Sequence, residues 1–165
     1  MKKLGLIALV TIVSAATALA GTVVIPFFVD TAGVDWSSGT GTPSSPAGDC
    51  SFLWVKNTTG GTITCTVAYR TGAGVADGPT PSPGNHNTFV LAPYQGIGWR
   101  PGNEDTTQES AQALDIGNMD SGYPNQAGSA TITWSGPATD IVASCRFIGN
   151  GSEGLMGVYG PFLGF

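Results

Sequence analysis

Residues 62–70 alternate between two kinds of side chain, and this period of two constrains the fold more than any other feature. Ile63, Cys65, Val67 and Tyr69 share one phase, while threonine and alanine dominate the other. An extended strand places alternate residues on opposite faces, so the segment predicts a β-strand with one core face and one solvated or lightly packed face. Other short apolar segments predict further strands, at residues 22–29, 51–56, 87–92, 95–100, 129–135, 140–148 and 155–159.

Glycine and proline separate these segments. The chain has 25 Gly and 11 Pro, which gather in long loops at 31–49 and 71–86 and in short turns. No helices alternate with the strands, which argues against a parallel α/β sheet. We therefore expect an all-β fold, a single antiparallel β-sandwich of the immunoglobulin-like or Greek-key type, with about eight short strands and long loops. Strands 51–56 and 62–70 are predicted to pair as a hairpin.

Charged residues are scarce in this chain. Six Lys or Arg and eleven Asp or Glu make up 10 % of the residues, whereas 41 % are hydrophobic. The hydrophobic share is enough for a core, but six cations do not supply the basic face that a nucleic-acid-binding protein needs. Coiled coils and helical bundles need more Ala, Glu, Lys and Leu and less Gly. The length of 165 residues suits one domain rather than two.

The first twenty residues predict a secretory signal peptide. Lys2 and Lys3 precede an apolar run at 4–13 and a small-x-small cleavage pattern at 18–20. The alternative is a membrane anchor, but a bilayer span takes roughly 20 apolar residues. We expect residues 1–20 to be removed, which leaves one domain at 21–165 with a net charge of −7 and no membrane insertion. The protein is then secreted, extracellular or on a bacterial cell surface, with the periplasm as the alternative.

Three cysteines, Cys50, Cys65 and Cys145, follow the cleavage site. In an oxidising compartment the simplest arrangement is one disulfide and one spare thiol. Cys65 and Cys145 are in phase with apolar residues, so we predict a Cys65–Cys145 bond across the core, with three buried thiols as the alternative. The order Cys65, Trp99, Cys145 is similar to the Cys, Trp, Cys order of immunoglobulin domains, but Ala143 occupies the position of their tyrosine. This similarity supports a sandwich and not membership of that family.

An acidic stretch at 104–120 holds most of the candidate metal ligands. Asp115, Asn118 and Asp120 offer three oxygen ligands for Ca²⁺, although they lack the EF-hand spacing and its terminal Glu. The interpretation that we favour is that these side chains are solvated loop residues. Zinc is disfavoured because no C-x-x-C pair exists and His86 is the one histidine. We therefore expect no cofactor, with this calcium site as the alternative.

Hydrolytic chemistry has two conceivable sources in the chain. A glycosidase needs two carboxylates, which Glu104, Asp105 and Glu109 could supply. A serine hydrolase needs a nucleophile, a base and an acid, but no G-x-S-x-G motif accompanies His86. The sequence therefore favours a protein that is not an enzyme.

Aromatic side chains could form a sugar-binding platform. Trp54 and Trp134 lie in predicted strands in phase with apolar neighbours, so we expect both in the core. Trp36 and Tyr123 lie in polar loops and are the candidates for contact with an extracellular glycan. The alternative is that each folds back over the edge of the core.

The predicted mature chain begins with an apolar strand at 22–29. Such an edge must be covered, either by its own domain or by strand addition to another copy. Pro26 breaks the strand or confines it to an edge, because proline donates no ladder hydrogen bond. The residues that could pair with a neighbouring copy are Val23, Val24, Ile25, Phe27, Phe28 and Val29.

These features favour a secreted, non-enzymatic structural or cell-surface protein, which could be a subunit of an extracellular polymer built from copies of itself through Thr22 to Val29. The first alternative is a carbohydrate-binding module that uses the loop aromatics. The second is a hydrolase that uses the loop carboxylates.

Overall fold

The structure is a computed structural model, and it describes residues 20–30, 50–82, 86–102, 114, 116–120, 126–148 and 156–163. The predicted signal peptide therefore lies outside the described residues except for Ala20. Strands dominate the described part, which confirms the all-β prediction. None of its helical segments has the length and apolar character needed to cross a membrane.

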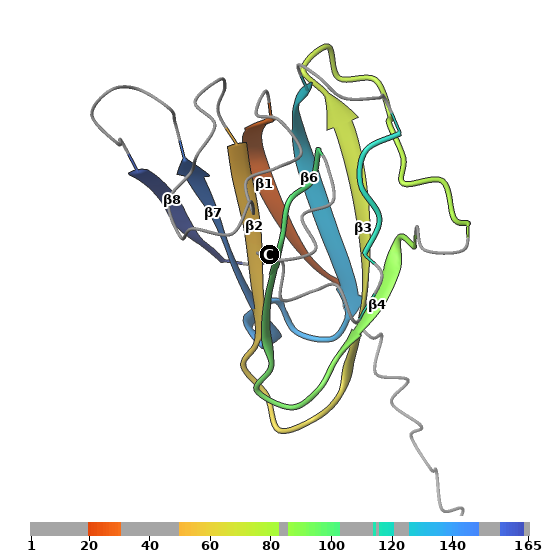
Figure 1. Ribbon diagram of the computed structural model, residues 1–165. Helices are drawn as coiled ribbons and strands as arrows, with labels where there is room; N and C mark the ends of the chain where they lie inside the picture. Colours follow the sequence, from red (N-terminus) through yellow and green to blue (C-terminus); the bar gives the residue numbers. More distant parts are fainter. Residues whose placement is uncertain are drawn as a thin grey trace, which may run out of the picture.

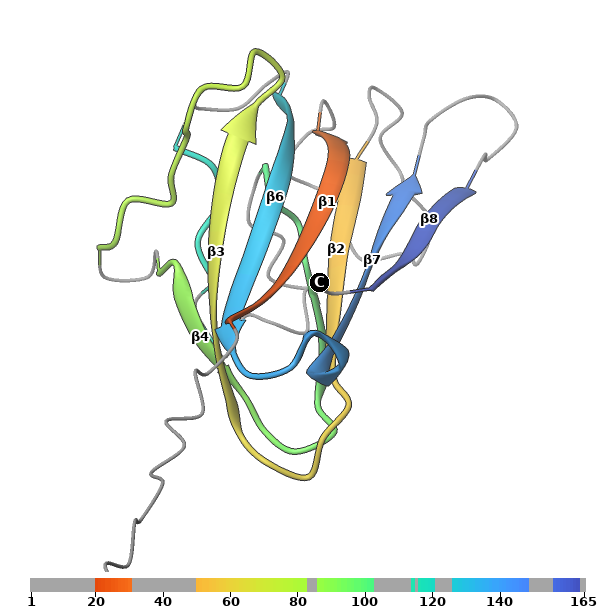
Figure 2. The ribbon, with the colours of Figure 1, turned by 180° about the vertical axis from the view of Figure 1, so that it is seen from behind.

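Eight strands form two antiparallel sheets of four (Figures 1 and 2). The first sheet has the order β1-β6-β3-β4, with β1 at Ala20–Asp30, β6 at Gln126–Ser135, β3 at Ile63–Thr71 and β4 at Thr88–Leu91. The second has the order β5-β2-β7-β8, with β5 at Gly96–Trp99, β2 at Cys50–Asn57, β7 at Ile141–Ile148 and β8 at Met156–Leu163. A short 3₁₀ helix, η2 at Ala138–Asp140, precedes β7.

One hydrophobic core takes side chains from both sheets. The four apolar residues that the period of two assigned to one face of β3 are all buried, which confirms the prediction for that strand. Aromatic contacts join the strands: Phe89 of β4 meets Trp99 of β5 at 5.8 Å between ring centroids, across the two sheets. Phe28 of β1 meets Tyr69 of β3 edge-on at 5.9 Å.

The predicted hairpin of β2 and β3 is wrong. The two strands belong to different sheets, because β2 pairs with β5 and β7 while β3 pairs with β4 and β6. The connection from β2 to β3 therefore crosses between the sheets, and the connection from β4 to β5 crosses at the same end, at the bottom of Figure 1. The backbone N–H of Tyr94 donates to the Thr59 carbonyl (3.0 Å), which joins the two crossings.

Asn57 holds the two crossings together. Its side chain is fully buried. Its amide Nδ2 donates to the carbonyls of Gly61 (2.7 Å) and Ala92 (2.9 Å), one in each crossing. Its Oδ1 accepts from the backbone N–H and the hydroxyl of Thr59 (2.8 and 2.9 Å). One amide thus satisfies polar groups of both crossings at the end of the core.

The first strand pairs within its own chain. β1 runs antiparallel to β6, with a register shift between Ile25 and Phe28 that confirms the predicted break at Pro26. Val23, Ile25 and Phe28 are fully buried, whereas Phe27 is exposed at the bulge. The N–H of Val29 also contacts the second sheet, because it donates to Ser51 Oγ of β2 (3.1 Å). The strand is therefore part of this chain's core.

We expect Asn57→Ala to lower the free energy of unfolding by about 2–4 kcal/mol, because it leaves buried polar groups of two crossings without their partner. Urea unfolding followed by circular dichroism measures the change. Thr62→Ala, at an exposed position in the same connection, is the control and should stay within about 0.5 kcal/mol of the wild type. Equal stability of the two variants would contradict this role for Asn57.

Candidate functional site

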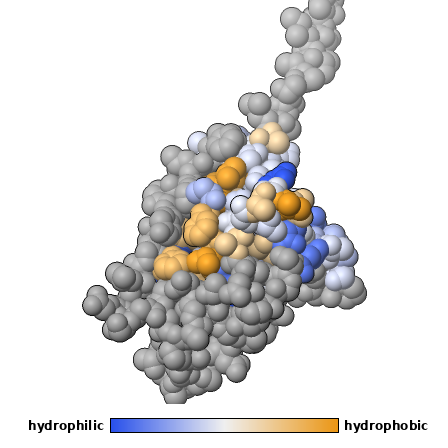
Figure 3. Space-filling model, turned by 90° about the horizontal axis from the view of Figure 1, so that it is seen from above, coloured by the Kyte–Doolittle hydropathy of each residue, from blue (hydrophilic) through white to orange (hydrophobic). Residues whose placement is uncertain are grey.

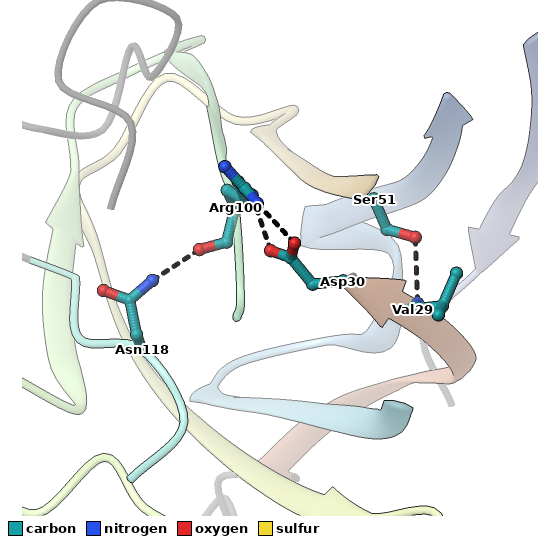
Figure 4. A network of polar contacts seen from close by, with 5 residues as sticks. All are labelled: Val29, Asp30, Ser51, Arg100 and Asn118. Atoms are coloured by element: carbon teal, nitrogen blue, oxygen red, sulfur yellow. Dashed lines mark hydrogen bonds and ion pairs between the residues drawn. The ribbon is translucent and has the colours of Figure 1, made fainter. Parts of the chain in front are cut away.

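The strongest polar feature of the described chain is a buried ion pair between Asp30 and Arg100 (Figure 4). Asp30 is the last residue of β1, and Arg100 directly follows β5. Both side chains are fully buried. Arg100 Nε donates to Asp30 Oδ2 (2.5 Å), and Arg100 Nη2 donates to Asp30 Oδ1. The two-point contact ties the end of a strand in one sheet to the end of a strand in the other.

Neighbouring residues pack closely around this ion pair. A Cβ atom added to Gly102 would lie 2.5 Å from the Cβ of Asp30, so only glycine fits beside the carboxylate. Asn118 Nδ2 donates to the Arg100 carbonyl (2.6 Å), as Figure 4 shows. The N–H of Met119 donates to the Pro101 carbonyl (2.9 Å). The segment at 116–120 is therefore held against the end of β5.

A second polar chain runs from the core to the same segment. Trp99 Nε1 donates to the hydroxyl of Tyr69 (2.7 Å), which in turn donates to the Gly117 carbonyl (3.0 Å). The N–H of Gly117 donates to the His86 carbonyl (2.7 Å). Each buried aromatic polar atom thus has a partner, and the partners position one segment.

Both charges of the Asp30–Arg100 pair are shielded from solvent and matched to each other. Because neither side chain is exposed, a solute cannot reach them without opening the fold. We therefore assign the pair to stability and to the closure of this end of the molecule. Sequence reasoning missed it, although one signal was present: in a chain with few charges, Asp30 and Arg100 each end an apolar strand.

The predicted calcium ligands are engaged in protein contacts where they are described. Asn118 binds the Arg100 carbonyl, and Asp120 accepts from the N–H of Thr80 (3.0 Å) and from its hydroxyl. Asp115 lies outside the described residues. Within the described ranges, no three His, Cys, Asp or Glu side chains gather at one point. Calcium binding by these residues stays a prediction.

The other loop candidates also lie outside the described residues. They are the glycan candidates Trp36 and Tyr123 and the hydrolase candidates Glu104, Asp105 and Glu109. His86 is exposed and joins Ile116 through its backbone.

All three cysteines are buried and none forms a disulfide, so the predicted Cys65–Cys145 bond is not present in the structure. Cys65 lies on β3, whereas Cys145 lies on β7, which faces β1 across the core. β3 is two strands away from β1. Neighbouring strands lie about 4.8 Å apart and packed sheets about 10 Å apart. The Cα atoms of Cys65 and Cys145 are therefore farther apart than the ~7 Å that a disulfide spans.

Burial changes the acidity of these thiols. Desolvation raises the pKa of Cys65 to about 12. Desolvation also raises the pKa of Cys145 to about 11, and a hydrogen bond with Ser51 works in the opposite direction. Both thiols are protonated at neutral pH and are poor nucleophiles.

Trp54 is exposed, and its predicted place in the core is wrong, whereas Trp134 is buried as predicted. Trp54 shares its phase with Lys56, so both point outward from the second sheet. The other exposed large hydrophobic residues, Phe27, Val75, Val90 and Tyr94, lie on different elements. Seen from above, apolar and polar residues of the described part are interspersed (Figure 3).

The outer face of the first sheet carries a row of threonines. Thr22, Thr133, Thr66 and Thr88 are register partners across all four strands. The hydroxyls of Thr66 and Thr88 lie 3.4 Å apart. A shallow depression of about 350 Å³ opens beside the row, lined by Ala20, Thr64, Thr66, Thr133, Trp134 and Ser135. We call this surface the threonine face.

No protein-family model matches the chain, and no curated protein or solved structure matches it significantly.

We expect Asp30→Leu or Arg100→Met to lower the free energy of unfolding by about 3–5 kcal/mol, because each leaves a buried charge without its partner. The double variant Asp30→Leu/Arg100→Met should lose less than either single variant, since it buries no charge. Urea unfolding of the four proteins measures the coupling. Losses in the double variant equal to the sum of the two single losses would contradict the pairing.

The raised thiol pKa values predict a loss of stability in alkali. Above the ordinary thiol pKa of 9.0, the unfolded chain releases its thiol protons while folded Cys65 keeps its proton up to about 12, so the free energy of unfolding falls over this range. The advantage of the wild type over Cys65→Ala should therefore be smaller at about pH 11 than at about pH 8. An advantage that is equal at both pH values in urea unfolding would refute this linkage.

Proposed function

We propose that the protein is a secreted, non-enzymatic β-sandwich that serves as a structural or cell-surface component and associates with copies of itself. The observation that carries the proposal is the threonine face.

In immunoglobulin domains the first two strands are neighbours. Here β1 is next to β6, so we propose a sandwich with a different strand order.

The threonine face suits association because it is almost free of charge. Apart from Pro26 and Phe27 at the bulge of β1, its strands present threonine, serine, alanine and valine outward, and Arg70 at the end of β3 is the one charged residue among the outward positions described. The predicted mature chain has a net charge of −7, so copies repel one another wherever their carboxylates approach. A face without carboxylates avoids this repulsion, and exposed Val90 adds apolar surface to it.

Association through the threonine face is more favourable than association by exchange of β1. Donation of Thr22 to Val29 to another copy would withdraw Val23, Ile25 and Phe28 from the core. Addition at the edge of β1 is opposed by Pro26, which has no N–H, and by Val29, whose N–H is bound to Ser51. We therefore propose that copies meet through the outer face of the sheet that contains β1 and not through the edge of that strand.

The size of this face indicates a weak pairwise contact. Four strands about 4.8 Å apart and up to about 30 Å long cover roughly 500 Å², below the ~800 Å² per partner of a standard interface. Such a contact gains strength when many copies are held at one surface. The proposal is thus a component of an extracellular layer or polymer rather than a stable dimer.

We expect the average mass of the secreted protein, measured by sedimentation, to rise with concentration. Thr66→Lys and Thr133→Lys place a charge in the middle of the face and should abolish the rise. Val75→Lys, at an exposed position outside the face, is the matched control and should associate like the wild type. A monomer at every concentration, or association unchanged in the two face variants, would overturn the proposal.

A further inference from the structure

The outer face of the second sheet holds an aromatic side chain with an unusual neighbour. Trp54 stands on β2, between β5 and β7, opposite Gly98 on one side and Ser144 on the other. Its side chain is 38 % exposed although it lies on an inner strand of the sheet. Gly96 is the other outward position of β5, so this strand presents no side chain on that face.

The indole lies face-down on the backbone of β5. A Cβ atom built on Gly98 would be 2.8 Å from Cδ2, 2.8 Å from Cε3 and 2.9 Å from Cε2 of Trp54. These three atoms belong to the six-membered ring, and a point equidistant from them lies over the centre of that ring. One ring face therefore covers Gly98, and its exposed surface is on the side away from the sheet.

A cation lies beside this ring. Lys56 is exposed, two residues from Trp54 on the same strand and on the same face, which is about 6.8 Å along the strand. Arg146 is also on this face, opposite Phe52 in the register of β2 and β7. The outward positions described on β5, β2 and β7 include no carboxylate. Among these positions Lys56 is therefore the exposed cation.

We propose that Trp54, seated on Gly98 and flanked by Lys56, forms a binding site for a pyranose sugar that carries a carboxylate. The negative face of an indole attracts the weakly positive C–H groups on the flat side of a pyranose ring. Lys56 is placed to pair with a carboxylate on the stacked sugar or on its neighbour in the chain. The ligand class is therefore an acidic polysaccharide such as a polyuronate.

This site is independent of the threonine face, because the two lie on outer faces of different sheets. It is also defined without Trp36 and Tyr123, which lie outside the described residues. A surface component with both features would associate with its copies through one sheet and hold an acidic glycan with the other.

Titration with a galacturonic acid hexasaccharide, followed through the indole N–H signals of the four tryptophans, tests the proposal. The Trp54 signal should shift, and Trp54→Ala should weaken binding about tenfold or more. Gly98→Ala keeps the indole but places a Cβ where the ring lies against β5. The displaced ring should bind the sugar several-fold more weakly. Lys56→Met should remove most of the salt dependence of binding.

Phe27→Ala removes an exposed aromatic side chain from the other sheet and is the matched control. It should bind like the wild type, and circular dichroism should show every variant folded. No shift of the Trp54 signal at saturating sugar, or equal binding by Trp54→Ala, overturns the site. Loss of binding in Trp36→Ala alone also overturns it. Equally tight binding of the neutral cellohexaose overturns the acidic class of ligand.

Discussion

The buried contact between Asp30 and Arg100 determines how the two sheets meet at one end of the molecule. Two opposite charges, both without solvent exposure, are tolerated because the guanidinium matches the carboxylate at two points. The pair joins the end of β1 to the end of β5, and Gly102 leaves the space that the carboxylate needs. At the opposite end, Asn57 binds both crossings between the sheets. The core lies between these two polar closures.

The two closures leave each outer face free to differ. The buried polar groups at the two ends of the sheets bind one another and not solvent. The difference in surface chemistry therefore lies between the two outer faces. The first sheet presents hydroxyls and methyl groups with almost no charge, whereas the second presents an exposed indole and cations. Because the faces are separate, the two proposed binding sites do not compete with each other. Together with the threonine face, this division supports the proposed surface component rather than a single-pocket protein.

Period-two patterns predicted the strands well because the burial of alternate side chains is a local property. They could not predict which strands pair, because a chain that leaves β2 can turn back or cross to the other sheet with the same alternation. The crossing is bound by Asn57, whose partners include a residue 35 positions away. Asp30 and Arg100 are 70 positions apart, so no local pattern links them. The loop candidates at 31–49 and 104–115 are almost entirely outside the described residues, and their roles stay predictions.

Trp54 shows how phase within a strand could have corrected the prediction. In β2 the residues Leu53, Val55 and Asn57 share the inward phase, while Trp54 shares its phase with Lys56. A lysine is almost never buried without a partner, so its phase marks the outer face and places the tryptophan there too. The neighbouring strand agrees, because its outward positions are Gly96 and Gly98, which leave room for a large side chain to lie across them. The apolar character of Trp54 is therefore weaker evidence of its position than the charge two residues away.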